Sequence, residues 1–547
     1  MRNIHLRYVE EEYDARGILC KYRMKCPDDF NFAYDVVDDI GINDPGRRAL
    51  VWCDIHGNER TMTFGEIKRH SDKAANFFRS AGIEKGDTVL VILKNSYQFW
   101  YVLTALHKLG AIPIPATFML KKHDVEYRVN AASIKAAICI SSDGVPEAID
   151  SAENVPTLTS KIMLGGQRDG WYDLESGVEK ASDVLERVPT KATDTLIIYF
   201  SSGTSGHPKM VLQDHTYPIG HIFTAKHWHN VDPDGLHFTI ADTGWAKSVW
   251  GKYYGQWIME AGVFVYDFDK FIPNDVLRTI SKYKVTTLCC PPTMFRMFLN
   301  DGDVSSHDLS HLKYTTIAGE ALNPDVFEKW YAATGLKLME GYGQTETTVS
   351  ICNITGMEPR PGSMGKPSPQ YIIDIVDMDG NSCPAGVTGE IVIASEPYPF
   401  GLMRGYYRDP DKTTSTIYNG WHHSGDVAWR DEDGYIWYVG RNDDIIKSSG
   451  YRIGPFEIES VLANHPSVKE CAVTGVPDDI RGQLVKATIV LRSGFTPSDE
   501  LKKEIQNFVK RETAPYKYPR VVEFVNELPK TISGKIRRVE IRDHDRK

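Results

Sequence analysis

The stretch Leu196-Ile-Ile-Tyr-Phe200, followed at once by Ser201-Ser-Gly-Thr-Ser-Gly-His-Pro-Lys209, decides how this chain folds and what it binds. The apolar run predicts a strand buried on both faces of a sheet. The two glycines and four hydroxyl residues after it leave backbone N–H groups free to wrap an anion, and Lys209 adds a positive charge. Composition alone is also typical of a surface turn. The position directly after a buried strand favours a phosphate-binding loop.

This loop differs from the loop of the Walker-type nucleoside triphosphatases, because the pattern G-x-x-x-x-G-K-[ST] does not fit it. Pro208 and the apolar residues Met210-Val-Leu212 indicate that no helix begins at the end of the loop. The sequence therefore predicts that loop donors, and not a helix dipole, hold the phosphate.

Strand-sized apolar runs alternate with helical segments on both sides of this loop. Thr63-Phe-Gly-Glu66 predicts a capped helix that reaches about Ser80, and Gly110 predicts the end of a helix over residues 98–109. The alternation recurs over residues 89–140 and 263–318. It predicts an α/β fold with largely parallel sheets covered by helices.

The pattern changes after about residue 360. Short strands among Gly, Asp and Pro turns predict a β-rich, antiparallel subdomain over about residues 360–440. Gly440-Arg-Asn-Asp-Asp444 is polar and turn-rich, which is typical of a junction between domains. We expect a large N-terminal domain over residues 1–440 and a small α+β domain over residues 441–547.

Composition excludes several classes of protein. A chain of 547 residues with 41% apolar and 25% charged residues is an ordinary globular protein with more than one hydrophobic core. A net charge of −10 gives no reason to expect nucleic acid as a partner. Residues 501–547 carry 13 Lys and Arg against 7 Asp and Glu, which predicts either a solvated basic surface or contact with an anion.

The chain also lacks the usual sequence signals of other compartments. It has no apolar run near the ~20 residues of a membrane span. Its start contains no apolar segment of a signal peptide, and the acidic residues 10–12 are unlike a transit peptide. None of the nine cysteines form a C-x-x-C pair. These features predict a reduced, cytoplasmic chain without a disulfide framework or a zinc site.

Four collinear segments carry a family resemblance. Tyr199–Lys209, Tyr342-Gly-Gln-Thr-Glu346, His423-Ser-Gly-Asp426 and Thr531-Ile-Ser-Gly-Lys-Ile536 resemble the core motifs of the AMP-forming acyl-CoA synthetases, within the adenylate-forming superfamily. The resemblance spans roughly residues 50–540. Gly244-Trp245, residues 448–455 and residues 514–519 look most like the medium-chain acyl-CoA synthetases.

The resemblance implies a two-step reaction. ATP and a carboxylic acid form an acyl-adenylate and pyrophosphate, and the thiol of coenzyme A then takes the acyl group and releases AMP. Lys535 would bridge the carboxylate and the α-phosphate, Thr345 would donate to the α-phosphate, and Glu346 would bind Mg²⁺. Asp426 would accept both ribose hydroxyls, with Arg441 close by.

The resemblance also assigns the remaining nucleotide contacts. Gly319–Ala321 and Glu340–Gly343 would flank the adenine ring, and Tyr342 would stack on it. The expected ATP and AMP site comprises Ser201, Ser202, Gly203, Thr204, Ser205, Gly206, His207, Pro208, Lys209, Gly319, Glu320, Ala321, Glu340, Gly341, Tyr342, Gly343, Gln344, Thr345, Asp426, Arg441 and Arg452.

The same resemblance implies that the small domain rotates between the two half-reactions about a hinge at Asp443. The second orientation would bring Ser449, Gly450 and Arg452 to the active site. Together with Arg481 and Tyr518, these residues form the expected coenzyme A site, although Arg481 and Tyr518 are also typical of a charged surface.

The expected acyl pocket comprises Trp245, Lys247, Trp250 and Gly343. The acetate-specific relatives have Trp at the position of Gly343, so glycine removes a wall and predicts a chain longer than acetate. Trp250 could refill part of that space, which would favour a short or branched acid. Lys247 either extends its amine towards solvent or reaches the mouth of the pocket.

The predicted function is an AMP-forming acid–CoA ligase of fatty acid metabolism that uses ATP, Mg²⁺ and coenzyme A on a short- to medium-chain, straight or branched acid. One alternative is an enzyme that delivers the adenylated acyl group to a carrier protein. Another is a non-catalytic nucleotide-binding protein on the same fold. The intact Lys535, Glu346 and Asp426 favour an enzyme. The acid and the oligomeric state stay open.

Overall fold

The computed structural model describes residues 3–201, 208–449, 451–530 and 536–545. Its contacts divide the chain into two compact units. The larger unit comprises residues 1–372 and 394–421, and the smaller one comprises residues 373–393 and 422–547. The fold is α/β, as the alternation of strands and helices predicts.

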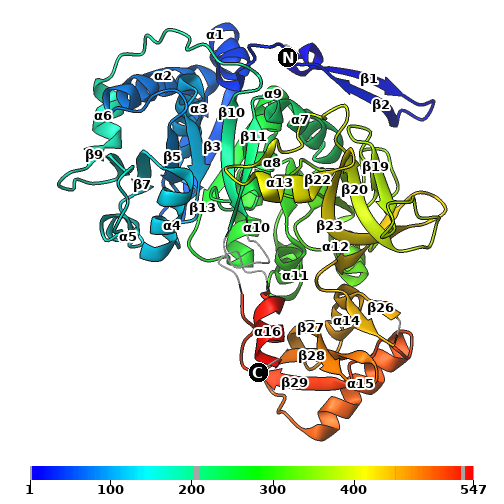
Figure 1. Cartoon of the computed structure of the whole chain (residues 1–547). Helices are drawn as coiled ribbons and strands as arrows, with labels where there is room; N and C mark the ends of the chain where they lie inside the picture. The colour runs from blue at the N-terminus through cyan, green and yellow to red at the C-terminus, as the bar shows by residue number, and fades with distance from the viewer. Residues whose placement is uncertain (1–2, 202–207, 450, 531–535, 546–547) are drawn as a thin grey trace. The chain divides into compact units, whose positions relative to one another are not determined.

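Among the described residues, the largest sheet has nine strands in the order β18-β17-β16-β15-β14-β12-β13-β3-β4, and its central strands β16 to β3 are parallel (Figure 1). Their bounds are β3 Arg48–Asp54, β4 Glu59–Thr63, β12 Leu236–Thr239, β13 Gly262–Asp267, β14 Thr287–Cys290, β15 Tyr314–Ile317, β16 Leu338–Tyr342, β17 Ile351–Cys352 and β18 Lys366–Pro367.

A second, fully parallel sheet of the larger unit has the order β6-β5-β7-β8-β9. Its strands are β5 Thr88–Ile92, β6 Ile112–Pro115, β7 Ala136–Ile140, β8 Ser160–Leu164 and β9 Tyr172–Asp173. Every residue of β5 and β7 is buried, because helices cover both faces of such a sheet.

Helices connect these strands, and their ends follow the predicted caps. In α2, the Thr63 hydroxyl accepts from the Glu66 N–H while the Glu66 carboxylate accepts from the Thr63 N–H. Gly110, in the left-handed conformation, ends α3. The helices of the larger unit are α1 Asp39–Asn43, α2 Phe64–Ser80, α3 Gln98–Leu109, α4 Lys122–Ala132, α5 Val145–Asp150, α6 Leu174–Lys180, α7 Tyr217–Phe223, α8 Ala246–Lys252, α9 Tyr254–Ile258, α10 Pro273–Lys282, α11 Pro292–Asn300, α12 Pro324–Thr334 and α13 Pro410–Thr416.

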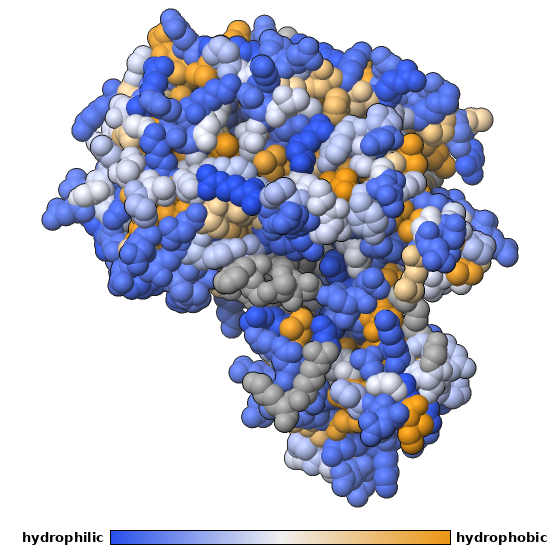
Figure 2. Space-filling view, in the orientation of Figure 1, coloured by the Kyte–Doolittle hydropathy of each residue, from blue (hydrophilic) through white to orange (hydrophobic). Residues whose placement is uncertain are grey.

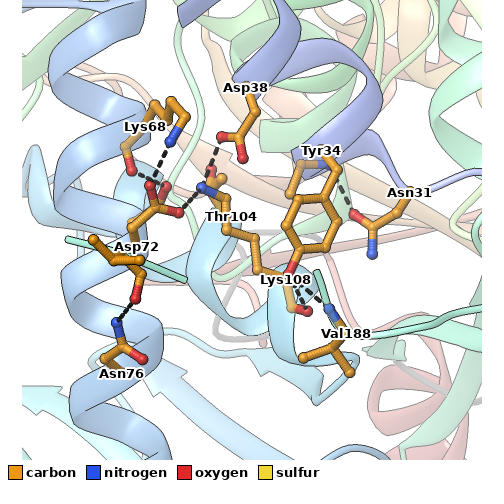
Figure 3. A network of polar contacts seen from close by, with 12 residues as sticks. Asn31, Tyr34, Asp38, Lys68, Asp72, Asn76, Thr104, Lys108 and Val188 are labelled. Atoms are coloured by element: carbon orange, nitrogen blue, oxygen red, sulfur yellow. Dashed lines mark hydrogen bonds and ion pairs between the residues drawn. The ribbon is translucent and has the colours of Figure 1, made fainter. Parts of the chain in front are cut away.

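A buried ionic network joins α2 and α3 to the segment before α1. The Lys108 ammonium is fully buried and lies 2.7 Å from Asp38 Oδ1 and 2.5 Å from Asp72 Oδ1. Lys68 approaches the other oxygen of Asp72 at 2.7 Å. Figure 3 shows these four side chains converging from three segments. Two lysines and two aspartates balance in charge, which is what burial of ions requires.

An antiparallel hairpin, β1 Val9–Tyr13 and β2 Leu19–Met24, projects near the N-terminus (dark blue in Figure 1). The Glu11 side chain attaches it to the body, because its two oxygens lie 2.5 Å from Lys226 Nζ and 2.8 Å from His227 Nε2. Burial opposes the charge on Glu11, but hydrogen bonds from His227 and Lys226 lower its pKa to about 2.

The smaller unit holds two sheets. In the first, β19 Ile373–Val376, β20 Gly389–Ala394, β23 Trp421–Arg430 and β24 Ile436–Arg441 lie side by side. In the second, β26 Tyr451–Ile453, β25 Ile446–Ser448, β28 Gly482–Leu491 and β27 Val468–Asp478 follow one another, and β29 Val521–Val525 pairs with β28. Helices α14 Pro455–Leu462 and α15 Asp499–Glu512 contribute to one apolar core with this sheet, and α16 Arg538–Asp545 contacts β27.

Hydrophilic residues dominate the face of the molecule in Figure 2, and apolar residues appear on it singly or in small groups. In the described part of the chain, no helix has both the length and the apolar character needed to cross a membrane. All nine cysteines are described, and all have free thiols.

Candidate functional site

The predicted phosphate loop connects two antiparallel strands. β10 Thr195–Ser201 ends where the loop begins, and β11 Lys209–Asp214 starts where it ends, so Ser201 pairs directly with Lys209. No helix starts at Lys209, in agreement with the sequence. The Ser201 hydroxyl is buried and has no partner among the described residues. A buried hydroxyl without a partner is rare, and a bound oxyanion is one group that would satisfy it.

Glu346 and Lys209 meet at a tyrosine that sequence reasoning missed. Tyr406 lies on β21 Gly405–Tyr406, which pairs with β11. Its hydroxyl donates to Glu346 Oε1 at 2.9 Å, and Lys209 Nζ lies 3.4 Å from that hydroxyl and 3.9 Å from Glu346 Oε1. A cation and a carboxylate are therefore held at one point beside the loop. Only its pairing with β11 brings Tyr406 there, and no sequence motif marks it.

The segments expected around adenine follow adjacent parallel strands. Ile317 of β15 pairs with Glu340 of β16, so Gly319–Ala321 and Gly341–Gly343 both lie at the carboxyl ends of these strands. Ligands collect at such edges of a sheet. Gly319 has φ +104°, a conformation that favours glycine. The structure thus brings the two predicted adenine segments together.

Glu340 itself is buried. Its Oε1 accepts from the Leu322 N–H at 3.2 Å, while Oε2 has no partner in the described structure. Burial raises the pKa of Glu340 to about 8, so the carboxyl is mostly protonated at pH 7. Thr345 lies in the turn after β16, where its carbonyl accepts from the Gln213 amide at 3.2 Å.

Trp250 fills the space beside Gly343. A Cβ atom placed on Gly343 would overlap Cη2 of Trp250 and the carbonyl oxygen of Thr348. Trp250 belongs to α8 and is buried, and its indole N–H has no partner among the described residues. Trp245 caps the same helix and is half-buried. The space that glycine leaves at position 343 is therefore already occupied by an aromatic side chain.

Lys247 points inward. Its ammonium donates to the Ala318 carbonyl at 2.5 Å and would lie 3.5 Å from a Cβ atom at Gly319. The amine therefore reaches the strand end that precedes the adenine segment, and does not extend towards solvent. It links the acyl-pocket helix to the nucleotide segment.

In the smaller unit, Asp426 and Arg441 face each other across β23 and β24. Arg441 Nη1 lies 3.6 Å from Asp426 Oδ1, and the Tyr438 hydroxyl donates to the same oxygen at 3.2 Å. Burial and the Asp426 charge raise the pKa of Tyr438 well above its usual value. Sequence reasoning missed Tyr438, because two-residue periodicity places residues 438 and 441 on opposite faces of a strand. In the structure, the pairing of β23 with β24 shifts register between Val427 and Ala428, and the Tyr438 hydroxyl reaches Asp426.

Of the expected coenzyme A residues, two contact each other. The Ser449 N–H donates to the Arg481 carbonyl at 2.8 Å, and Arg481 Nη1 donates to the Ser449 hydroxyl at 3.3 Å. Tyr518 has other neighbours: its hydroxyl accepts from Arg520 at 2.9 Å, and Lys510 lies over its ring. Arg441 Nε lies 3.6 Å from the expected hinge residue Asp443.

Several predicted residues lie outside the described part of the chain. They are Ser202, Gly203, Thr204, Ser205, Gly206, His207, Gly450 and Lys535. The backbone of Arg452 belongs to β26, and its side chain is likewise outside the description. The roles of all these residues stay predictions.

Comparisons with known proteins identify the family. The family model for AMP-binding enzymes matches residues 41–407, and the model for the AMP-binding enzyme C-terminal domain matches residues 457–535. The human protein named acyl-coenzyme A synthetase ACSM3, mitochondrial, is 42% identical over 533 residues, which cover 95% of this chain and 90% of that protein. Human ACSM5 is 40% identical over 535 residues, covering 96% and 92%.

Solved structures agree. The anthranilate CoA ligase AuaEII in complex with anthranoyl-AMP superposes with a TM-score of 0.85 at 30% identity, covering 95% of this chain and 98% of that chain. The acyl-CoA synthetase of Brucella canis superposes with a TM-score of 0.74 at 30% identity, covering 95% of both chains.

The same comparisons overturn one expectation. The absence of a recognisable targeting segment predicted a cytoplasmic chain, but the relatives ACSM3, ACSM4 and ACSM5 are all named mitochondrial. The sequence was a poor guide because targeting depends on short segments of loose composition, which leave little trace in a folded domain.

The other expectations of family and reaction are confirmed by these matches. The predicted adenine segments lie at the carboxyl ends of β15 and β16, and a cation lies beside a carboxylate next to the predicted phosphate loop. The chain belongs to the AMP-binding enzyme family and, within it, to the AMP-forming acyl-CoA synthetases, which join a carboxylic acid to coenzyme A at the expense of ATP.

Proposed function

We propose that this acyl-CoA synthetase acts on a short- to medium-chain, straight or branched aliphatic acid. The observation that carries this proposal is the indole of Trp250 beside Gly343. Glycine at position 343 brings no side chain of its own into the pocket, and Trp250, which lies in the space beside it, limits how far an acyl chain can extend. Each methylene buried in the remaining space adds about 0.8 kcal/mol of binding.

The first half-reaction joins two anions. A carboxylate oxygen attacks the α-phosphorus of ATP, a P–O bond forms, and pyrophosphate leaves with the electrons of the bond that breaks. Lys209 supports the phosphate loop with its charge, and Lys535 neutralises the carboxylate and α-phosphate as they approach. Thr345 donates to the α-phosphate, and the ribose hydroxyls bind Asp426, which Tyr438 and Arg441 hold in place.

Mg²⁺ fits this site as an ion that arrives with ATP. In the described residues, no group of three or more His, Cys, Asp or Glu side chains is placed to hold a metal ion. A single carboxylate beside phosphate oxygens suits Mg²⁺, and Glu346 provides it. Bound Mg²⁺ would neutralise charge on the phosphates. Tyr406 and Lys209 keep the Glu346 carboxylate in position.

The second half-reaction needs a different surface of the small domain. The sulfur of coenzyme A attacks the acyl carbonyl, a thioester forms, and AMP leaves. Rotation about Asp443 would move Lys535 out of the active site and bring in Ser449, Gly450 and Arg452. Arg481 and Tyr518 would then contact coenzyme A. The Ser449–Arg481 contact supports a shared role for these two residues.

The function is tested by mixing the protein with ATP, Mg²⁺, coenzyme A and a series of acids from acetate to octanoate, including 2-methylbutyrate. We expect thioester and AMP, with the highest kcat/KM between three and six carbons. An adenylate without thioester would identify a carrier-directed enzyme. No pyrophosphate release with any of the acids would identify a non-catalytic nucleotide-binding protein.

The lysine assignment has its own test. Lys535→Ala should lower the rate of adenylate formation at least about a hundredfold, since it removes the charge that offsets two anions. Thioester formation from preformed acyl-AMP and coenzyme A should stay near the wild-type rate. Equal loss in both half-reactions would contradict the rotation.

A further inference from the structure

Helix α16 begins three residues after Lys535 and packs firmly on the small domain. Its residue Ile541 is buried against Ala472, Val490 and Leu528. Before the helix, Lys530 and Ile536 form an antiparallel bridge. The position of α16 therefore determines where the described end of the lysine-bearing segment lies.

Four charged side chains, which we call the Asp444 clamp, hold the start of this helix. They are Asp444, Glu459, Arg538 and Arg542. Arg542 donates to Asp444 Oδ1, and Arg538 Nη1 lies 3.7 Å from Asp444 Oδ2. Arg538 Nη2 also donates to both Glu459 oxygens, at 2.8 and 2.7 Å. Although burial opposes its charge, Glu459 and Asp444 raise the pKa of Arg538.

The clamp is sheltered from water. The four side chains are between 13% and 25% exposed, so these ion pairs are less screened than surface pairs. Glu459 is fixed in turn, because its Oε1 also accepts from the Val473 N–H of β27 at 2.8 Å. The clamp therefore ties α16 to α14, to β27 and to the turn that contains Asp444.

The residues on either side of Asp443 are anchored to different elements. The Asn442 N–H donates to the Gly425 carbonyl beside β23 at 2.8 Å, and Arg441 pairs with Asp426 of that strand. Asp444, in contrast, is bound to α16 by the clamp. Asp443 is the residue between the two anchors. The Asp444 and Ile445 N–H groups also donate to the Arg441 carbonyl, at 3.0 and 3.1 Å, so Asp443 lies in a hydrogen-bonded turn between the two anchors.

We propose that Asp444, Arg538 and Arg542 are positioning residues that fix the lysine-bearing segment relative to the hinge for adenylate formation. This inference rests on the proposed function, since it uses the roles of Lys535 and Asp443. Loss of the clamp removes the ion pairs that tie Asp444 to α16, and with them a constraint on the part of the chain that leads to the Lys535 amine. The reaction needs that amine within a narrow range of positions.

The clamp should affect only one half-reaction. The coenzyme A residue Ser449 follows β25 directly, and β25 is held in the sheet by the pairing of Ser448 with Gly482 of β28. That connection does not pass through α16. A weakened clamp should therefore affect α16 and the segment before it. It should leave Ser449, which is held by β25 and β28, in place.

The test measures the two half-reactions separately for Asp444→Asn and Arg542→Gln. We expect adenylate formation in a single turnover to slow at least about tenfold, with the KM for ATP and the rate of thioester formation from acyl-AMP both within about twofold. The double variant should be no slower than Asp444→Asn alone, because Asp444→Asn already breaks the pair with Arg542 that Arg542→Gln breaks. Arg542→Lys, which keeps the charge, should recover most of the rate.

Arg537→Gln is the matched control, since Arg537 precedes α16, is exposed, and in the described structure its side chain pairs only with Glu540. It should leave both half-reactions unchanged, and the thermal midpoints of all variants show whether they fold. Equal loss in both half-reactions, additive losses, or wild-type rates would overturn the proposal. If Lys535→Ala is selective for adenylation while the clamp variants are not, only this inference fails. If Lys535→Ala is not selective, the proposed function fails first.

Discussion

Trp250 determines how much room an acyl chain finds in this enzyme. Trp250→Ala should shift preference to longer acids, because it empties the space next to Gly343. Octanoate has two more carbons than hexanoate, and each buried methylene adds about 0.8 kcal/mol. The ratio of kcat/KM for octanoate over that for hexanoate should therefore be roughly tenfold higher in Trp250→Ala than in the wild type. Steady-state kinetics on the acid series measures this.

Trp171→Ala, which changes a partly exposed tryptophan on another sheet, should leave the ratio unchanged. An unaltered preference in Trp250→Ala would show that another side chain limits the pocket. The reverse substitution, Gly343→Trp, is a poorer test. Even one added carbon would meet the backbone of Thr348, which cannot move aside as a side chain can.

Some site residues could be predicted from sequence and others could not, for physical reasons. Lys209, Glu346 and Asp426 belong to local motifs whose spacing is fixed along the chain. Tyr406 reaches Glu346 across 60 positions, and only strand pairing brings the two together. The sequence could not predict that Lys247 points inward to the Ala318 carbonyl. A flexible four-carbon side chain can place its amine either in solvent or against a carbonyl inside the protein.

At the scale of elements, the predicted helices α2 and α3 match closely, and the alternation predicted over residues 89–140 is observed as β5, α3, β6, α4 and β7. Their periodicity, caps and terminating glycines are local signals. The hairpin β1–β2 escaped prediction, since its residues Val9–Tyr13 are mostly polar and its contacts with the body, through Glu11 and Tyr22, are with residues about 200 positions away.

The Glu11 attachment should depend on pH. Its lowered pKa of about 2 means that the ionised form stabilises the fold above about pH 4.5, and that this stability is lost as the pH falls towards 2. Glu11→Gln should therefore cost about 2–3 kcal/mol at pH 7. Urea unfolding measured between pH 7 and pH 3 should show the difference from wild type shrinking.

Glu12→Gln on the same strand is the control. Glu12 pairs with Lys21 on the surface, where a salt bridge contributes about 0–1 kcal/mol. A cost of Glu11→Gln that stays constant with pH would contradict the assignment of the stability to its charge.

The buried network of Figure 3 holds α2 and α3 together. Lys108→Met should lower the free energy of unfolding by about 3–5 kcal/mol, because two buried carboxylates lose their shared cation. Lys21→Met, at an exposed pair that water and salt screen, should change it far less. Denaturant titrations compare the two, and equal effects would show that the network contributes no more than a surface pair.

At the scale of the whole molecule, we propose that residues 441–547 fold by themselves. Their apolar core, from Ile446 to Val522, is formed by α14, α15 and the sheet around β28. A fragment of these residues should give a dispersed amide NMR spectrum and a cooperative thermal transition. A collapsed spectrum would instead mean that the β19–β24 sheet, which belongs to the same compact unit, is needed for folding.

All nine cysteines lie in the described chain, and Cys20 on β2 is the exposed one. Six others are buried: Cys53, Cys139, Cys289, Cys290, Cys352 and Cys383. Cys26 is half-buried, and burial raises its pKa to about 12, which suppresses its reactive thiolate. A maleimide dye added at neutral pH should thus label the native enzyme first at Cys20. The hairpin carries its own attachment point for a fluorescent reporter, without any engineered cysteine.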